Sequence, residues 1–265
     1  MNVFFHEVRA YRKTTIIWTL SLVGVMALFM SMFPTIAKDI EEYQKVLDGF
    51  PDAMKQALGL QVETFGSVLG FYSYVFVYIS LCGAIQAMNF GTAIVSKEVR
   101  EKTADFLLTK PITRKAILTA KMIAAFTSIL FTSLVYIVAA WLVVDVVATD
   151  DYSIKAFFLI SLSLFLLQVI FLGIGIFLSV FLPKIKSVLS VSLATVFAFF
   201  IIGMLSSTGG EGFKRYLSPF KYFDSSYIMK HSSYEGVFLL VGLGIVLMAT
   251  IASFFHYTKK DIHSV

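Results

Sequence analysis

Hydrophobic residues gather into six long runs that short polar segments separate. An α-helix rises 1.5 Å per residue, so about twenty apolar residues cross the hydrocarbon of a bilayer. The pattern therefore predicts an all-α membrane protein, a bundle of six transmembrane helices. Several runs exceed twenty residues, which predicts tilted helices or helices that extend beyond the hydrocarbon. The expected spans are residues 14–33, 66–95, 116–144, 156–182, 188–207 and 234–257.

Composition supports this interpretation. Of the 265 residues, 58% are hydrophobic and 15% are charged, and the mean hydropathy is +0.82, whereas a soluble domain is about one quarter charged. No internal repeat is found, so we expect one continuous domain over residues 1–265. Residues 1–13 are basic and amphipathic and continue into the first run without a small-residue cleavage site. They predict a short amphipathic helix before a retained first span, not a cleaved signal peptide.

The distribution of charge orients the bundle. The two termini and the loops at 97–115 and 183–187, with Lys121, hold 14 Lys and Arg residues against five acidic residues. The other three connections hold eight basic and twelve acidic residues. By the positive-inside rule, both termini face the cytoplasm. This rule also explains the net charge of +5 without a nucleic-acid partner.

Two of the outer connections are long enough to fold. Residues 34–65 are acidic and have apolar residues at helical spacing, which predicts a partly helical, amphipathic cap at the membrane surface. Residues 208–233 begin with Gly209, Gly210 and Gly212 and then interleave aromatic and basic residues, a composition that suits the level of the lipid headgroups. This segment is either a helix that lies along the membrane or a gate through which a substrate leaves.

No span carries a charge at its centre, which argues against a proton-coupled carrier or a voltage-gated channel. Gln86 and Asn89 in the second span and Gln168 in the fourth are the notable polar groups. Either they make hydrogen bonds between helices, which are worth about 0.6 kcal/mol each, or they line a translocation path. Gly173 and Gly175 are expected to permit close helix packing.

The segment between Val95 and Lys121 holds seven of the 22 Lys and Arg residues. Thr103 is suited to cap a short helix, with Asp105 in its first turn and Pro111 at its end. Three consecutive apolar residues lie between them: Phe106, Leu107 and Leu108. The segment is either a solvated loop that lies on the lipid or a helix that seats in a groove of another protein. Downstream, Thr113 is a candidate cap for the third span, and we expect Arg114, Lys115 and Lys121 at the level of the lipid phosphates.

This segment resembles the signature of ABC-2 type transporter permeases. The residues that carry the resemblance are Glu98, Glu101, Thr103, Asp105, Phe106, Leu107, Leu108, Pro111, Arg114 and Lys121. The six-span plan, the amphipathic N-terminal segment and the sequence from Ser218 to Phe220 before the last span fit the same family. Lys102 stands where the family usually has a glycine, which would allow a sharp break between the second span and the following helix.

The resemblance implies a partnership. Such a permease pairs with a second permease subunit, identical or related, and with cytoplasmic ABC ATPases that hold ATP and Mg²⁺; it binds no cofactor itself. The residues expected to couple to the ATPase are Glu98, Glu101, Thr103, Asp105, Phe106, Leu107, Leu108 and Pro111. The resemblance also implies export, across the plasma membrane of a bacterium, of an amphipathic peptide, an antibiotic or another hydrophobic compound. We assign the translocation path and the dimer seam to spans one, two and five, with Gln86 and Asn89 as the named residues.

The sequence lacks the motifs of the main alternative activities. It contains no Gly-x-x-x-x-Gly-Lys-Ser/Thr loop for nucleotide phosphates and no His-Glu-x-x-His metal motif, so the chain is not expected to be an enzyme. Cys82, the one cysteine, lies inside an apolar run and is expected to pack there. The alternative from another class is a membrane scaffold or sensor subunit that holds a cytoplasmic partner through the same charged segment and moves no cargo.

Overall fold

The computed structural model describes residues 3–51, 54–55, 64–100, 113–149, 151–182, 185–207 and 213–259. Within these ranges every element is a helix, which confirms the predicted all-α fold. The order is α1 (Val3–Met30), α2 (Phe33–Lys38), α3 (Ile40–Asp48), α5 (Val68–Arg100), α7 (Arg114–Val147), α8 (Ile154–Phe181), α9 (Val188–Ser207), η1 (Phe213–Leu217), η2 (Pro219–Lys221), α10 (Ser225–His231) and α11 (Gly236–Lys259). Six helices in the described ranges are long and apolar enough to cross a membrane, namely α1 with α2, α5, α7, α8, α9 and α11.

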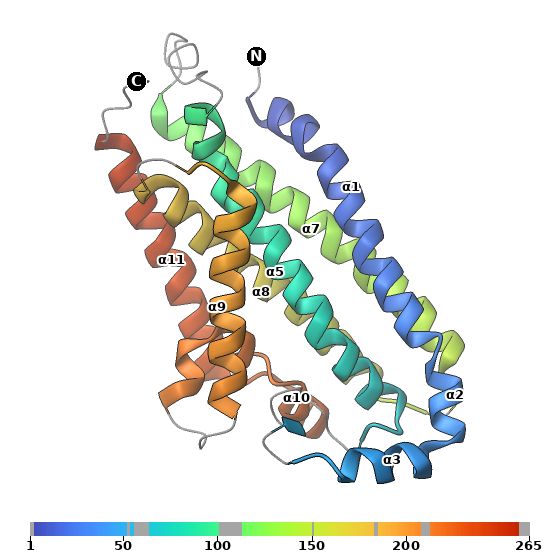
Figure 1. Ribbon diagram of the computed structural model, residues 1–265. Helices are drawn as coiled ribbons and strands as arrows, with labels where there is room; N and C mark the ends of the chain where they lie inside the picture. Colours follow the sequence, from blue (N-terminus) through green and yellow to red (C-terminus); the bar gives the residue numbers. More distant parts are fainter. Residues whose placement is uncertain are drawn as a thin grey trace.

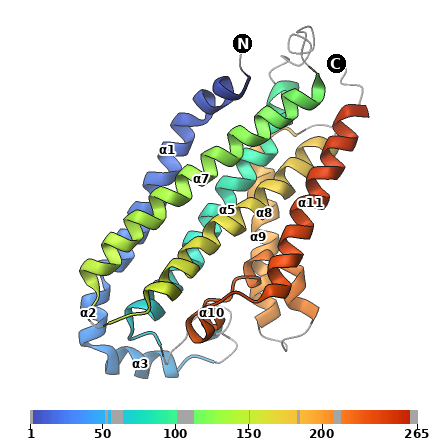
Figure 2. The same cartoon turned by 180° about the vertical axis from the view of Figure 1, so that it is seen from behind.

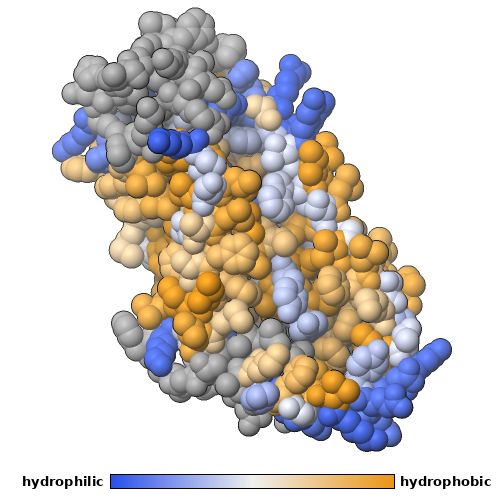
Figure 3. All heavy atoms as spheres, in the orientation of Figure 1, coloured by the Kyte–Doolittle hydropathy of each residue, from blue (hydrophilic) through white to orange (hydrophobic). Residues whose placement is uncertain are grey.

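The six long helices run side by side (Figures 1 and 2). The start of α1 and the end of α11 lie at the same end of the bundle, which we call the termini end (Figure 1). The opposite, far end carries α2, α3 and α10. On the face drawn in Figure 3, hydrophobic residues form a broad belt and hydrophilic residues gather towards the two ends. This distribution suits a protein whose middle lies in hydrocarbon.

Helices α5 and α8 form the centre of the bundle and pack against each other more extensively than any other pair. In their most apolar stretches 72% of the residues of α5 and 61% of those of α8 are buried, against 17–33% in the other spans. Helices α1 and α7 cover one side of this pair, and α9 and α11 cover the other (Figures 1 and 2). The peripheral helices therefore leave apolar surface that lipid or another subunit must cover.

Glycine permits the close approach of the two central helices. A Cβ atom built on Gly91 would lie 2.5 Å from the carbonyl oxygen of Leu172, and one built on Gly175 would lie 2.8 Å from that of Met88. These neighbours are backbone atoms, which a side-chain rotation cannot move. At Gly173 the nearest atom would lie at 3.6 Å, on α11, which is an ordinary contact. The expected packing role of the glycines in the fourth span is thus strongest at Gly175.

The N-terminal segment differs from the expectation of a separate short helix. It continues without interruption into the first span as α1, from Val3 to Met30. The stretch contains no proline, and its one glycine, Gly24, lies deep inside the span, so nothing breaks the helix near residue 13. Glu7 and Tyr11 are buried against the bundle, and this packing also favours a straight continuation.

Two of the connections at the far end contain short helices where they are described. The first contains α2 and α3, in agreement with the predicted helical content of residues 34–65. The second is divided into η1, η2 and α10, because Pro219 opens η2 and Asp224 caps α10 by accepting from the N–H groups of Ser226 and Tyr227. The segment at 208–233 is therefore made of short pieces where it is described, and α10 has only 7 residues.

Candidate functional site

The residues expected to couple to a partner lie almost entirely outside the described part of the chain. Residues 101–112 contain Glu101, Thr103, Asp105, Phe106, Leu107, Leu108 and Pro111, and nothing is described for them. Glu98 belongs to the last turns of α5, and its side chain is likewise not described. The structure does describe the two helices that enter and leave this segment, α5 and α7.

A lysine joins these two helices near the segment. Lys121, on the third turn of α7, is 2% exposed and donates a hydrogen bond of 2.9 Å to the carbonyl oxygen of Ile94 on α5. The same ammonium lies 3.5 Å from Oε1 of Glu7 on α1. One buried cation therefore contacts three helices at the termini end. We call Glu7, Ile94 and Lys121 the stem contact.

The expectation that Lys121 lies at the lipid phosphates is wrong. Lys121 follows Arg114, the first residue of α7, by seven positions, which places it roughly 10 Å further along the helix. At that depth α7 is packed against α1 and α5, so the side chain is buried in the protein. A buried ammonium needs a counter-ion and hydrogen-bond acceptors, and Glu7 and the Ile94 carbonyl supply them. Thr113 does cap α7 as predicted, by accepting from the N–H of Ala116.

A chain of buried polar side chains crosses the bundle further from the termini. Gln86 on α5 donates to the hydroxyl of Thr132 on α7 at 2.9 Å and accepts from Nε2 of Gln168 on α8 at 3.1 Å. The Thr132 hydroxyl lies 3.0 Å from that of Thr19 on α1, and Ser133 donates to Oε1 of Gln168 at 2.7 Å. We call these five residues the polar network. All five are buried, and together they tie α1, α5, α7 and α8.

A second group of hydroxyls lies nearer the far end of the same helices. The phenol oxygen of Tyr72 on α5 lies 2.7 Å from the hydroxyl of Ser161 on α8 and 3.2 Å from the phenol oxygen of Tyr136 on α7. Tyr72 and Tyr136 are both fully buried. Helices α5, α7 and α8 are thus held together by polar contacts at two levels, in addition to the stem contact.

Gln86 and Asn89, the two residues assigned to the translocation path, have different surroundings in the structure. Gln86 is 0% exposed and belongs to the polar network, so its contacts favour the alternative of hydrogen bonds between helices. Asn89, one turn further along α5, is half-buried and makes no hydrogen bond within the described part of the chain. It shares the less buried side of α5 with Tyr78, whose hydroxyl donates to that of Tyr74 at 3.3 Å.

Several members of these contacts were not singled out from the sequence: Glu7, Thr19, Tyr72, Thr132, Ser133, Tyr136 and Ser161. Their spacing does carry a signal, since Thr132 and Tyr136 lie four residues apart and so share one face of α7. The partners of that face belong to other helices, and helix packing decides which ones meet. Within the described residues no group of three or more His, Cys, Asp or Glu side chains is placed to hold a metal ion.

Comparison with known proteins gives a family match over nearly the whole chain. The family model described as "ABC-2 family transporter protein" matches residues 1–262. No curated protein matches the chain.

Proposed function

The chain belongs to the ABC-2 family of transporter proteins, and from this premise we propose that it is the membrane-spanning permease subunit of an ATP-driven exporter. The observation that carries the proposal is the family match over residues 1–262 on a chain with six apolar helices long enough to span a bilayer. The protein is a multi-pass membrane protein. We place it in a bacterial plasma membrane with the termini end in the cytoplasm, as the surplus of Lys and Arg at that end favours.

The energy for transport comes from ATP hydrolysis by a partner protein. The segment at 101–112, with Glu98, seats in a groove of a separate cytoplasmic ATPase, and the apolar residues Phe106, Leu107 and Leu108 fill that groove. ATP and Mg²⁺ are held by the ATPase, and this chain carries out no catalysis of its own. The absence of a phosphate-binding loop from the sequence is consistent with this division of labour.

The stem contact supports the mechanical part of the proposal. Because Lys121 bonds the backbone of α5 from α7, the two helices that flank the coupling segment move together when a partner displaces it. Helix α5 has 33 residues and continues through the polar network to the far end. A displacement at the termini end is thus carried along α5, α7 and α8 as a rigid-body movement, of the kind that switches transporters between two states.

The translocation path lies along the less buried side of α5, between α1 and α9. Asn89 has an amide without a partner in the described part of the chain, and hydrogen-bonding groups inside a membrane gain from facing a polar partner or a cavity. A second permease subunit, identical or related, closes this side and forms the dimer seam on α1, α5 and α9. Gln86 supports the wall of the path from within the polar network. The cargo is an amphipathic peptide, an antibiotic or another hydrophobic compound.

Coupling is tested by comparing Phe106→Asp with Phe106→Leu. The proposal predicts that Phe106→Asp weakens co-purification with the ATPase or its hydrolysis of ATP by at least about tenfold, because a charge enters an apolar groove. Phe106→Leu keeps the apolar contact and should stay within about threefold of the unchanged chain. Both variants should insert into the membrane. Equal assembly and equal hydrolysis for the two variants would refute the coupling role, and binding without any transport would favour the scaffold alternative.

A further inference from the structure

A cavity of about 80 Å³ lies among residues of α5, α8, α9 and the segment from η2 to the start of α10. Helices α5 and α9 diverge towards the far end of the bundle (Figure 1). Helix α5 contributes Phe76, Val77 and Ser80, α8 contributes Ser163 and Leu167, and α9 contributes Phe200, Gly203 and Met204. Phe220, Lys221, Phe223 and Ser225, from η2 to the start of α10, complete the lining. The volume is enough for several water molecules, or for a small headgroup with the first carbons of a chain.

Most of this lining is apolar, and the polar exceptions are few. Four phenylalanine rings, Val77, Leu167 and Met204 face the space. Two of the three serines are already engaged as donors, since Ser80 donates to the carbonyl oxygen of Val77 and Ser163 to that of Ile160. Among the described residues that line the cavity, Lys221 is the charged one. The cavity therefore combines aromatic walls with one cation.

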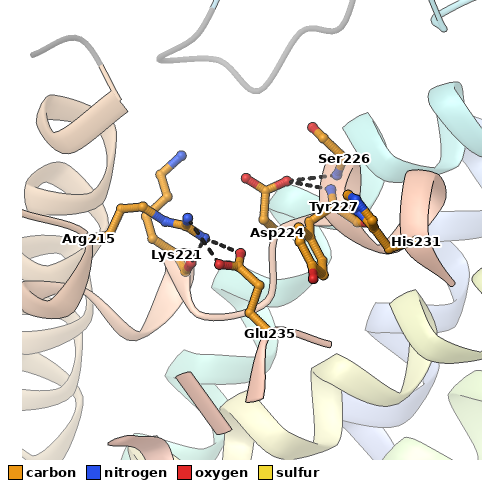
Figure 4. A network of polar contacts seen from close by, with 7 residues as sticks. All are labelled: Arg215, Lys221, Asp224, Ser226, Tyr227, His231 and Glu235. Atoms are coloured by element: carbon orange, nitrogen blue, oxygen red, sulfur yellow. Dashed lines mark hydrogen bonds and ion pairs between the residues drawn. The ribbon is translucent and has the colours of Figure 1, made fainter. Parts of the chain in front are cut away.

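The charged residues around Lys221 are paired, but its ammonium is not (Figure 4). Arg215 forms an ion pair of 2.6 Å with Glu235 and also donates to the carbonyl oxygen of Lys221 at 3.3 Å. Asp224 accepts from the backbone N–H groups of Ser226 and Tyr227, at 2.7 Å and 3.2 Å. The Lys221 ammonium lies apart from the Arg215–Glu235 pair and makes no hydrogen bond or ion pair within the described part of the chain.

Lys221 is held in this position by its surroundings. The aliphatic part of its side chain passes along α9, where a Cβ built on Gly203 would lie 3.8 Å from the Cγ atom of Lys221. Burial lowers the pKa of the ammonium, an effect that Arg215 reinforces and Asp224 opposes. An unpaired cation in a partly buried place is costly, and a charge-assisted hydrogen bond from an anion would offset that cost.

We propose that this cavity is a binding site for a single-chain anionic amphiphile, with the headgroup at Lys221 and the first part of the chain among the phenylalanine rings. The charge of Lys221 selects the headgroup, and the aromatic walls of α5, α9 and the segment at 220–223 select the chain. The site lies towards the far end, beside the aromatic and basic segment whose composition suits the level of the headgroups. It does not depend on coupling to an ATPase, so it can be tested on the isolated chain.

The test uses the full chain in nanodiscs of zwitterionic phosphatidylcholine. The tryptophans Trp18 and Trp141 are replaced by phenylalanine, and Phe200→Trp places a fluorophore in the cavity wall. Dodecanoate with a bromine on its chain is added as the probe, because bromine quenches tryptophan at close contact. The matched ligand is its methyl ester, which has the same chain and the same bromine without the charge. Binding of radiolabelled dodecanoate to the chain without these substitutions, corrected with empty discs, repeats the measurement without the reporter.

Lys221→Gln is compared with Lys230→Gln, which removes an exposed lysine of α10. The proposal predicts that Lys221→Gln weakens binding of the brominated dodecanoate by about tenfold and leaves the ester unchanged, and that Lys230→Gln alters neither. Val77→Phe, which fills the cavity, should weaken binding of both ligands. Equal binding of acid and ester to the chain with Lys221 would overturn the proposal, as would displacement of the probe by inorganic phosphate alone or equal effects of the two lysine substitutions.

Discussion

Lys121 and Glu7 form a buried ion pair at the termini end, with 3.5 Å between the ammonium and the carboxylate oxygen Oε1. The pair joins α7 to α1, and the hydrogen bond of 2.9 Å from Lys121 to the Ile94 carbonyl adds α5. The second carboxylate oxygen of Glu7 has no hydrogen-bond partner in the described part of the chain. The carboxylate therefore depends on the lysine for compensation of its charge.

Removal of Lys121 should destabilise the protein strongly. Lys121→Met leaves the Glu7 carboxylate buried without its cation, and breaking a buried pair in this way costs about 3–5 kcal/mol. The double change of Glu7→Leu with Lys121→Met should recover much of that loss, since no uncompensated charge remains. Thermal unfolding of the unchanged chain and of these variants, purified in one detergent, measures the order of their stabilities.

Lys115→Met, which changes an exposed lysine of the same helix, is the control and should alter the free energy of unfolding by less than about 0.5 kcal/mol. If Lys121→Met loses no more stability than Lys115→Met, Lys121 and Glu7 do not form a buried ion pair.

The polar network should make Gln86 more important for stability than Asn89. Gln86→Leu removes the donor to Thr132 and the acceptor for Gln168, and leaving buried groups unpaired costs about 1–3 kcal/mol. Asn89→Leu removes an amide that has no partner in the described part of the chain, so the isolated subunit should keep its stability. The two variants have the same side-chain chemistry on the same helix, which makes them a matched pair for thermal unfolding. Equal losses would show that Gln86 is not held as described.

A methyl group at Gly91 should destabilise the protein, because α5 and α8 are in close contact there. Gly91→Ala places a Cβ 2.5 Å from a backbone oxygen of α8, and relieving such overpacking costs about 1–3 kcal/mol. Gly173→Ala, where the nearest atom would lie at 3.6 Å, should be neutral or slightly stabilising, because alanine favours the helix over glycine. Unfolding of both variants in parallel measures the difference. A tolerated alanine at residue 91 would mean that the two helices are further apart.

Stability should rise with pH through Lys221. Because burial lowers its pKa in the folded state below the ordinary 10.5, with Arg215 adding to the shift and Asp224 opposing it, the unfolded chain binds more protons between those two values. Stability then increases as pH rises through that window and is lowest below the folded pKa. Thermal unfolding of the unchanged chain and of Lys221→Met, compared between pH 8 and pH 10, isolates the effect. The difference between the two should grow in favour of the unchanged chain at the higher pH, and parallel profiles would contradict the shift.

The six spans could be predicted from the sequence because hydrophobic length alone reports them. The ends of the spans are harder to predict from the sequence. The first span joins the N-terminal segment into one helix, since Tyr11 and Glu7 find burial against neighbouring helices. The second span runs on to Arg100, past the first charged residue, Lys97, because charged side chains at a helix end can extend into water without ending the helix.

The polar contacts could not be predicted in the same way. Gln86, Asn89 and Gln168 were recognised as polar residues in apolar spans, but their partners Thr132 and Ser133 belong to α7, whose rotation is set by packing. The sequence predicts Lys121 at the lipid phosphates because a positively charged side chain suits that depth in the membrane. Only the proximity of α1, which brings Glu7 to it, shows that it is buried. Local pattern therefore gave the helices, and contacts between helices decided the role of each polar group.

The most direct test of the account follows the accessibility of residue 89 during the ATP cycle. In a Cys82→Ser background, Asn89→Cys provides one thiol on the proposed path. The chain is reconstituted with its co-purified ATPase, and the labelling rate is measured with an impermeant maleimide confined to the far-end side of the membrane. The account predicts a labelling rate that changes several-fold between ATP and no nucleotide and that loses this dependence in Phe106→Asp but not in Phe106→Leu. A rate that is the same with and without ATP in an assembled, hydrolysing complex would contradict it.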